Sequence, residues 1–220
     1  MNTNDIQYWK IALLCIISAL GNIAFRGVIV DIANIPLYAD TVFTVAICFF
    51  AGLVPGLLTV AIYFTLSSIK YIFFEGFPLE SVWVINAYIF CAILEVLVVC
   101  FYSKKMKSSE DAFLEKPSLD SSTGILVHLL ILAIIACIAV SIAGGIIDFI
   151  LTRLNIAQGF SPEDNFKLGL LRNNVHILAT AMLSRIPINI IDRFIVVFGG
   201  FGISLLYGKF VKREKEKNIT

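Results

Sequence analysis

The chain has 220 residues, of which 59% are hydrophobic and only 15% charged, and its mean hydropathy is +0.90. Soluble domains contain about 45–50% apolar and about 25% charged residues, so this composition argues against a water-soluble globule, a disordered chain or a disulfide-stapled mini-protein. The formal net charge of +1 argues against a general nucleic-acid binder. At about 20 apolar residues per membrane span, the length leaves room for about six spans.

Six apolar stretches qualify as membrane helices. They cover about residues 8–25, 38–53, 55–74, 82–102, 124–151 and 188–210, in a single membrane domain over residues 1–220. Gly and Pro within residues 52–56 predict a tight turn between the second and third stretches. The predicted fold class is therefore an all-α membrane protein, built as a bundle of six transmembrane helices.

A seventh stretch, about residues 161–184, differs from the spans. It opens with Ser161-Pro162-Glu163-Asp164, which is typical of a helix start: a capping Ser, Pro in the first turn and acids at the positive end of the dipole. Apolar residues at helical spacing follow on one face and polar residues on the other. We expect an extra amphipathic helix before the last span, at the membrane interface or packed on the bundle.

The basic residues predict the orientation. Lysines at 104, 105, 107 and 116 follow the fourth span, five basic residues between 209 and 217 follow the sixth, and Lys10 precedes the first. Six spans place all of them on one face, which the positive-inside rule makes cytoplasmic. We therefore expect a multi-pass protein of the cell membrane with both termini in the cytoplasm.

Polar residues collect at the predicted outer ends of the spans. Ionisable groups within a span are costly, so Asp148, Asp192 and Arg193 indicate a polar pocket open to the outside, or else salt bridges that tie helix ends together. Glu95 lies past the middle of the fourth span. It either serves a proton or cation pathway, or is protonated or bonded to a neighbouring helix.

Other patterns bear on chemistry and on packing. The five cysteines lie in apolar runs without zinc-ligand spacing, so they are interpreted as packed hydrophobic residues, and no metal or cofactor is expected. No H-E-x-x-H, G-x-S-x-G, P-loop or dinucleotide motif is present, and no enzyme activity is expected. The first span carries a strip of small residues, Ala12, Cys15 and Ala19, which permits close packing within the chain or against a partner.

Two segments carry a resemblance to a known family. Residues 35–44 (I-P-L-Y-A-D-T-V-F-T), followed by residues 50–56 (F-A-G-L-V-P-G), resemble the front half of the substrate-binding S components of energy-coupling factor (ECF) transporters. There a proline-containing loop leads to an Asp-Thr helix start and then a glycine- and proline-containing hairpin. Residues 186–197 (I-P-I-N-I-I-D-R-F-I-V-V) are similar to the opening of the last helix in many members, with Arg193 in place of a lysine.

The resemblance implies a substrate-capture subunit that performs no chemistry itself. It would bind a scarce micronutrient, such as a vitamin, at the outer face. It would then dock through the strip Ala12, Cys15 and Ala19 on a transmembrane coupling subunit with two ATPases, topple in the membrane and release its substrate inside. Polar ligand contacts would come from Asp40, Asn86, Asp148, Asn189, Asp192 and Arg193. Trp83 and Tyr88 would stack on an aromatic ring, and residues 26–37 would form a lid.

Two other functions stay open on the sequence. The chain would suit a membrane sensor or signalling input module whose output is a separate protein. It would also suit a stand-alone ion-coupled carrier, with Glu95 as the coupling carboxylate.

Overall fold

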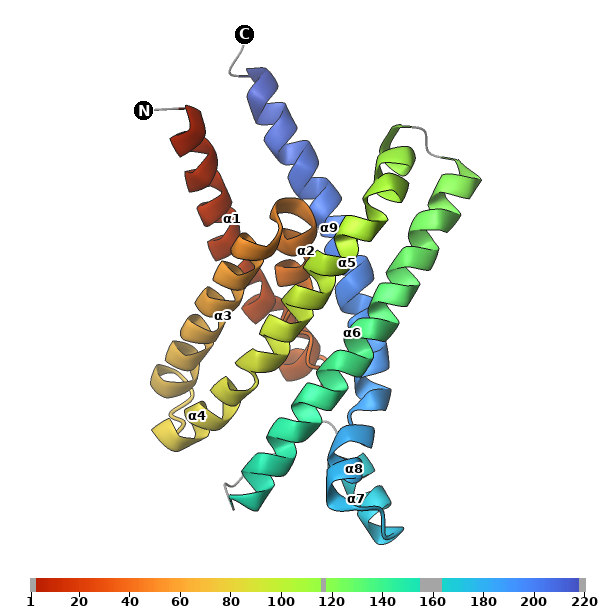
Figure 1. Cartoon of the computed structure of the whole chain (residues 1–220). Coiled ribbons are helices and arrows are strands. Elements are labelled where there is room, and N and C mark those ends of the chain that lie inside the picture. The colour runs from red at the N-terminus through yellow and green to blue at the C-terminus, as the bar shows by residue number, and fades with distance from the viewer. Residues whose placement is uncertain (1–2, 116–117, 155–163, 218–220) are drawn as a thin grey trace.

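The computed structural model describes residues 3–115, 118–154 and 164–217, and all regular structure in these ranges is helical (Figure 1). The helices follow one another along the chain, and η1 is a π-helical continuation of α1. Their bounds are α1 Thr3–Arg26, η1 Gly27–Ile32, α2 Val42–Ala51, α3 Leu53–Phe73, α4 Leu79–Ala87, α5 Ile89–Glu115, α6 Leu119–Arg153, α7 Asp164–Arg172, α8 Ile177–Leu183 and α9 Ile186–Lys217.

Five helical segments of the described residues are long and apolar enough to cross a membrane, which indicates a multi-pass membrane protein. These segments are Tyr8–Ile32, Leu53–Phe73, Val82–Asp111, Leu119–Arg153 and Ile177–Lys209. One of these helices, α6, exposes large apolar side chains on its outer face. Ile131, Ile138 and Ile142 are exposed, while Leu132 and Ala136 on the opposite face are fully buried. An apolar surface of this kind suits a lipid environment.

The second expected span, residues 38–53, differs from the structure. Only Val42–Ala51 is helical there, and ten residues reach about 15 Å against the about 30 Å of a bilayer core. Residues 34–41 before α2 contain no helix, and Asn34 and Ala39 have positive φ angles of 52° and 47°. Pro36 disfavours the helical conformation of Ile35 before it, and the positive φ of Ala39 interrupts a helix closer to Val42.

The expected amphipathic helix over residues 161–184 is divided in two. α7 and α8 are separated by residues 173–176, where Asn174 has a left-handed φ of 58°. The predicted helix start at residues 161–163 lies outside the described residues. α8 is followed by α9 after only two residues, so the second half of this stretch belongs to the last long helical segment.

α2 lies at the centre of the bundle and packs against α1, α3, α5 and α9. Val45 of α2, Val96 and Val99 of α5, and Val196 and Val197 of α9 share one apolar core and are at most 1% exposed. On the other side of the core, α6 packs against α5, α8 and α9. This packing fixes the polar face of α9 between α2, α5 and α6.

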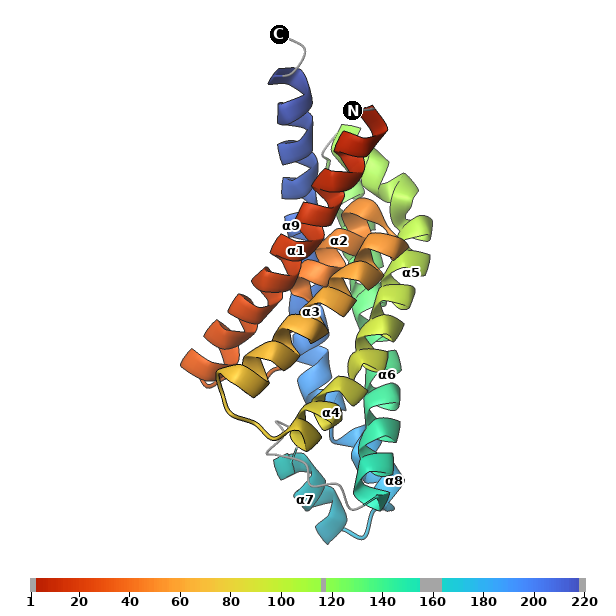
Figure 2. The same cartoon turned by 90° about the vertical axis from the view of Figure 1, so that its left-hand side faces the viewer.

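The two ends of the bundle differ in character. The start of α1, the end of α9 and the junction of α5 with α6 lie at one end, whereas α4, α7 and α8 lie at the other (Figures 1 and 2). The basic residues of 104–107 and of 209–217 therefore flank the end that carries both termini. We call the opposite end the distal end.

Candidate functional site

Three polar residues follow one another on a single face of α9 and the turn before it. Arg185, Asn189 and Arg193 are spaced by four residues and are 4%, 0% and 2% exposed. The backbone N–H of Asn189 donates to the carbonyl of Arg185 at 2.9 Å, so helical geometry includes Arg185. At 1.5 Å per residue, Arg185 and Arg193 are about 12 Å apart along the helix.

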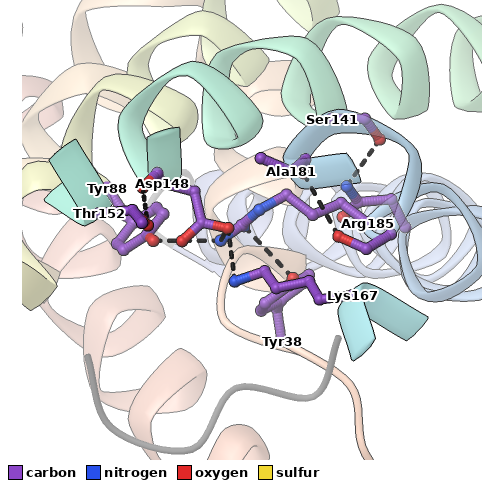
Figure 3. Close-up of polar contacts among 10 residues, drawn as sticks. Tyr38, Tyr88, Ser141, Asp148, Thr152, Lys167, Ala181 and Arg185 are labelled. Atoms are coloured by element: carbon purple, nitrogen blue, oxygen red, sulfur yellow. Dashed lines mark hydrogen bonds and ion pairs between the residues drawn. The ribbon is translucent and has the colours of Figure 1, made fainter. Parts of the chain in front are cut away.

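The first group of charges, here the distal cluster, consists of Asp148, Lys167, Arg185 and the hydroxyls of Tyr38 and Tyr88 (Figure 3). The Asp148 Oδ2 atom lies 2.5 Å from the Lys167 ammonium and 3.9 Å from the Arg185 guanidinium. Arg185 donates to the Tyr38 hydroxyl at 3.3 Å and to the Tyr88 hydroxyl at 3.1 Å. Segments distant in sequence therefore converge on one buried guanidinium.

Arg185 is also in contact with both aromatic rings. Its guanidinium carbon is 5.8 Å from the centroid of Tyr38 and 5.0 Å from that of Tyr88, within the range of a cation–π interaction. Two glycines of α6 allow Arg185 and α8 to lie close to this helix. A Cβ at Gly144 would lie 2.9 Å from Arg185 Nη1, and one at Gly145 would lie 2.7 Å from the Cα of Met182 on α8. Any larger side chain at these positions would push Arg185 or α8 away from α6.

The second group, here the central cluster, surrounds Arg193. Arg193 forms ion pairs with Glu95 of α5 and with Asp192, and it donates to the Thr41 hydroxyl at 3.2 Å. Glu95 and Asp192 are 1% and 0% exposed. Glu95 is thus bonded to a neighbouring helix, one of the two roles that the sequence left open.

The segment before α2 is fixed to this cluster through Asp192. The Ala39 N–H donates to Asp192 Oδ1 at 2.8 Å, and Ala39 holds a left-handed φ that is uncommon for a residue with a Cβ. Asp40 follows directly. Asp40 lies close enough to Arg193 for their charges to interact.

Two buried atoms on the polar face of α9 lack a partner among the described residues. Asn189 donates through its amide nitrogen to the Ser141 hydroxyl at 2.8 Å, but its Oδ1 has no hydrogen bond. The Nε of Arg193 also has none. An unsatisfied buried group of this kind costs about 1–3 kcal/mol, and most buried polar atoms of folded proteins are hydrogen-bonded.

Most of the side chains that the resemblance suggested for ligand binding lie in or beside these clusters. Asp40, Asp192 and Arg193 belong to the central region, Tyr88 and Asp148 belong to the distal cluster, and Asn189 lies between them. Two residues lie apart. Asn86 exchanges hydrogen bonds with Ser68 of α3 at 3.0–3.2 Å, and the Trp83 side chain on α4 is 72% exposed.

Sequence reasoning did not select Arg185, Lys167 or Tyr38 as site residues. The position of Arg185, four residues before Asn189, was the available signal, because it puts both side chains on one helical face. Lys167 and Tyr38 reach the distal cluster from segments whose placement depends on tertiary packing. No local pattern marks them.

The expected docking strip on α1 packs inside the chain. Cys15 and Ala19 are fully buried, Ala12 is half-buried, and the Cys15 thiol lies 3.5 Å from the Pro55 carbonyl of α3. The structure therefore gives these small residues the packing role that the sequence left as the alternative. The outward face of α1 carries large apolar side chains instead, among them Ile16, Ile17 and Leu20.

The described residues contain no group of three or more His, Cys, Asp or Glu side chains placed to hold a metal ion. All five cysteines are free and buried. The two clusters contain fixed charges, hydrogen-bond donors and hydrogen-bond acceptors from several helices. Such an arrangement is suited to recognition of a polar solute.

The fold and the clusters define a class, an α-helical multi-pass membrane protein with buried ion clusters toward its distal end. Comparison with known proteins does not narrow this class, because no family model, no curated protein and no solved structure matches the chain.

Proposed function

We propose that the chain is the substrate-capture subunit of a micronutrient uptake transporter, similar to an ECF S component. It binds a small, vitamin-like molecule at the distal and central clusters. It then delivers that molecule through a transmembrane coupling subunit with associated ATPases. The observation that carries the proposal is the convergence of buried Asp148, Arg185, Glu95, Asp192 and Arg193 from three helical segments within the apolar bundle.

The cost of these charges supports a ligand site. Replacing a buried ion pair by apolar residues of similar volume is often neutral or stabilising, so such pairs contribute little to stability. Ionisable residues inside membrane segments therefore mark substrate or ion pathways by default. Several of them on one helical face, together with an unpaired amide oxygen at Asn189, are more than bundle packing requires.

The proposal includes a topology of six crossings in the cell membrane. Residues 34–41 and α2 together form the second crossing, between the descending α1 and α3. Both termini lie in the cytoplasm, because the basic residues of 104–107 and 209–217 flank the same end. α7 and α8 lie at the external interface, where the apolar and polar faces of α7 meet lipid headgroups and the bundle.

Copurification combined with uptake tests the function. The tagged full-length chain, extracted from native membranes in mild detergent, should bring down an integral membrane subunit and ATPase subunits in constant proportion. Uptake in liposomes that contain this complex should depend on ATP. A complex without ATPases, or uptake that does not respond to ATP, would contradict the proposal.

The same preparations distinguish the proposed function from an ion-coupled carrier and from a membrane sensor. Uptake by the chain alone, collapsed by Glu95→Gln, would identify an ion-coupled carrier. The ion pair of Glu95 with Arg193 speaks against a free coupling carboxylate. A partner with kinase or cyclase activity, whose output is lost when residues 212–220 are deleted, would identify a sensor.

A further inference from the structure

The connection between α3 and α4 exposes several large apolar side chains. Phe73 and Phe74, at the end of α3, are 77% and 83% exposed, and Leu79 and Trp83 on α4 are 63% and 72% exposed. Single exposed apolar side chains are ordinary on a protein surface, but several of them within one short connection indicate a surface that contacts something else.

Polar contacts fix the shape of this connection. The Lys70 ammonium lies 2.9 Å from the Glu75 carboxylate and 3.7 Å from that of the exposed Asp31. The Phe77 N–H donates to the Tyr71 carbonyl at 3.0 Å, and the rings of these two residues have centroids 5.6 Å apart. The charges nearest to the exposed phenylalanines are therefore paired with one another, while the apolar side chains stay outside the turn.

The exposed side chains lie where two candidate membrane spans end. The segment formed by α3 stops at Phe73, and the next segment begins at Val82, one residue before Trp83. Leu58, Ile69 and Phe73 are all exposed and fall on one face of α3. The outward apolar face of a membrane span therefore continues without interruption into the connection.

The opposite end of the bundle has a comparable arrangement. Tyr8 and Trp9 open the first candidate span and are 71% and 57% exposed. Trp9 and Trp83 are the two tryptophans of the chain, and the helices that carry them, α1 and α4, begin at one end of the bundle and lie at the other (Figure 1). Tryptophan and tyrosine are enriched at both membrane–water interfaces, where their rings meet the headgroup level.

We infer that the connection between α3 and α4 inserts Phe73, Phe74, Leu79 and Trp83 into the lipid interface at the distal end, between headgroups and acyl chains. In the proposed topology this is the outer leaflet. A protein partner would also cover these side chains, but lipid is favoured because the patch continues the exposed face of a span. Trp83 then contacts lipid, in place of the ligand stacking that the resemblance implied.

The insertion also sets the depth of the distal cluster. Tyr88 follows Trp83 by five residues, which is about 7.5 Å along a helix at 1.5 Å per residue. The Tyr88 hydroxyl accepts from Arg185. The distal cluster therefore lies near the headgroup level, where a solute that arrives from outside can reach it.

Fluorescence quenching by brominated lipids tests the inference, because it reports the depth of a tryptophan. Trp9→Phe leaves Trp83 as the single reporter in the full-length chain. The variant is reconstituted in phosphatidylcholine vesicles that carry bromine either close to the headgroup or close to the end of the acyl chains. We expect the shallow bromine to quench Trp83 at least twofold more strongly than the deep bromine. A control with both tryptophans replaced by Phe and with Ile138→Trp, at an exposed position near the middle of α6, should show the reverse order.

Two double variants test whether the apolar side chains hold the connection in the membrane. In the Trp9→Phe background, Phe73→Ser/Phe74→Ser should at least halve the quenching of Trp83 by the shallow bromine. Leu114→Ser/Leu119→Ser removes exposed apolar side chains at the opposite end and should leave that quenching unchanged.

Three results would overturn the inference. Trp83 that neither lipid quenches is in water or covered by protein, and stronger quenching by the deep bromine would place it in the hydrocarbon core. Unchanged quenching in Phe73→Ser/Phe74→Ser would also contradict the anchoring role. None of these results depends on ATP-dependent uptake, so a failure here is distinct from a failure of the proposed function.

Discussion

Replacement of Arg193 by methionine is expected to destabilise the chain strongly. Arg193 is 2% exposed, and its two ion-pair partners Glu95 and Asp192 are at most 1% exposed. Arg193→Met leaves both carboxylates buried without this cation, and removal of one partner from a buried ion pair costs about 3–5 kcal/mol. For a chain of this size each kcal/mol lowers the unfolding midpoint by about 2–4 °C, which gives a fall of roughly 6–20 °C.

The buried cysteines supply the assay. All five are free and buried, so a thiol-reactive fluorophore reports unfolding of the detergent-purified protein as they become accessible. The double variant Arg193→Met/Glu95→Gln should recover part of the loss, because only one carboxylate is then left without its partner. Arg153→Met, at an exposed arginine over the Phe149 ring, is the control and should shift stability by about 0.5 kcal/mol or less. An unchanged midpoint in Arg193→Met, or a double variant as unstable as the sum of its parts, would refute the reasoning.

Three further predictions concern packing and topology. Gly145→Ala should cost about 1–3 kcal/mol, because its Cβ would lie 2.7 Å from the Met182 backbone, whereas Gly202→Ala meets nothing within 4 Å and should be neutral or slightly stabilising in the same assay. Asn22→Leu should cost about 1–3 kcal/mol, since it leaves the Phe43 N–H without its 2.9 Å acceptor; an unchanged unfolding midpoint would argue against this bond. A protease-cleavable tag at either terminus should be cut only in inverted membrane vesicles, and cutting in intact cells would contradict cytoplasmic termini.

The long helical segments were predictable because they depend on local composition. Runs of apolar residues with few charges identify helices such as α3 and α6 without knowledge of their neighbours. The position of the basic residues at one end of the bundle was also predictable. It follows from the number of predicted spans between residues 104–107 and 209–217, which returns the chain to the same side.

The start of α2 was not predictable, because a tertiary contact sets it. Residues 38–53 are apolar enough to suggest a full helix. In the structure, however, the Ala39 N–H bonds the Asp192 side chain and Ala39 takes a left-handed conformation. The break between α7 and α8 at Asn174 similarly follows from a backbone conformation that hydrophobic periodicity does not reveal.

For the candidate site, the sequence predicted which polar residues share an end of the bundle but not their partners. Asp148 and Asp192 were identified by their cost inside a membrane segment. Their partners are Lys167, Arg185 and the Ala39 N–H, which come from α7, the turn before α9 and the segment before α2. The small residues of α1 could also be identified only in part. Their spacing predicted close packing, but not whether the packed surface belongs to this chain or to a partner.

Native mass spectrometry of the chain purified from its own membranes tests the central claim most directly. The account predicts one small molecule per chain, retained by Asp31→Asn and lost in Arg185→Gln at a temperature where both variants are folded. A chain that carries no bound molecule, or an Arg185→Gln variant that retains it undiminished, would contradict a solute site at the buried clusters.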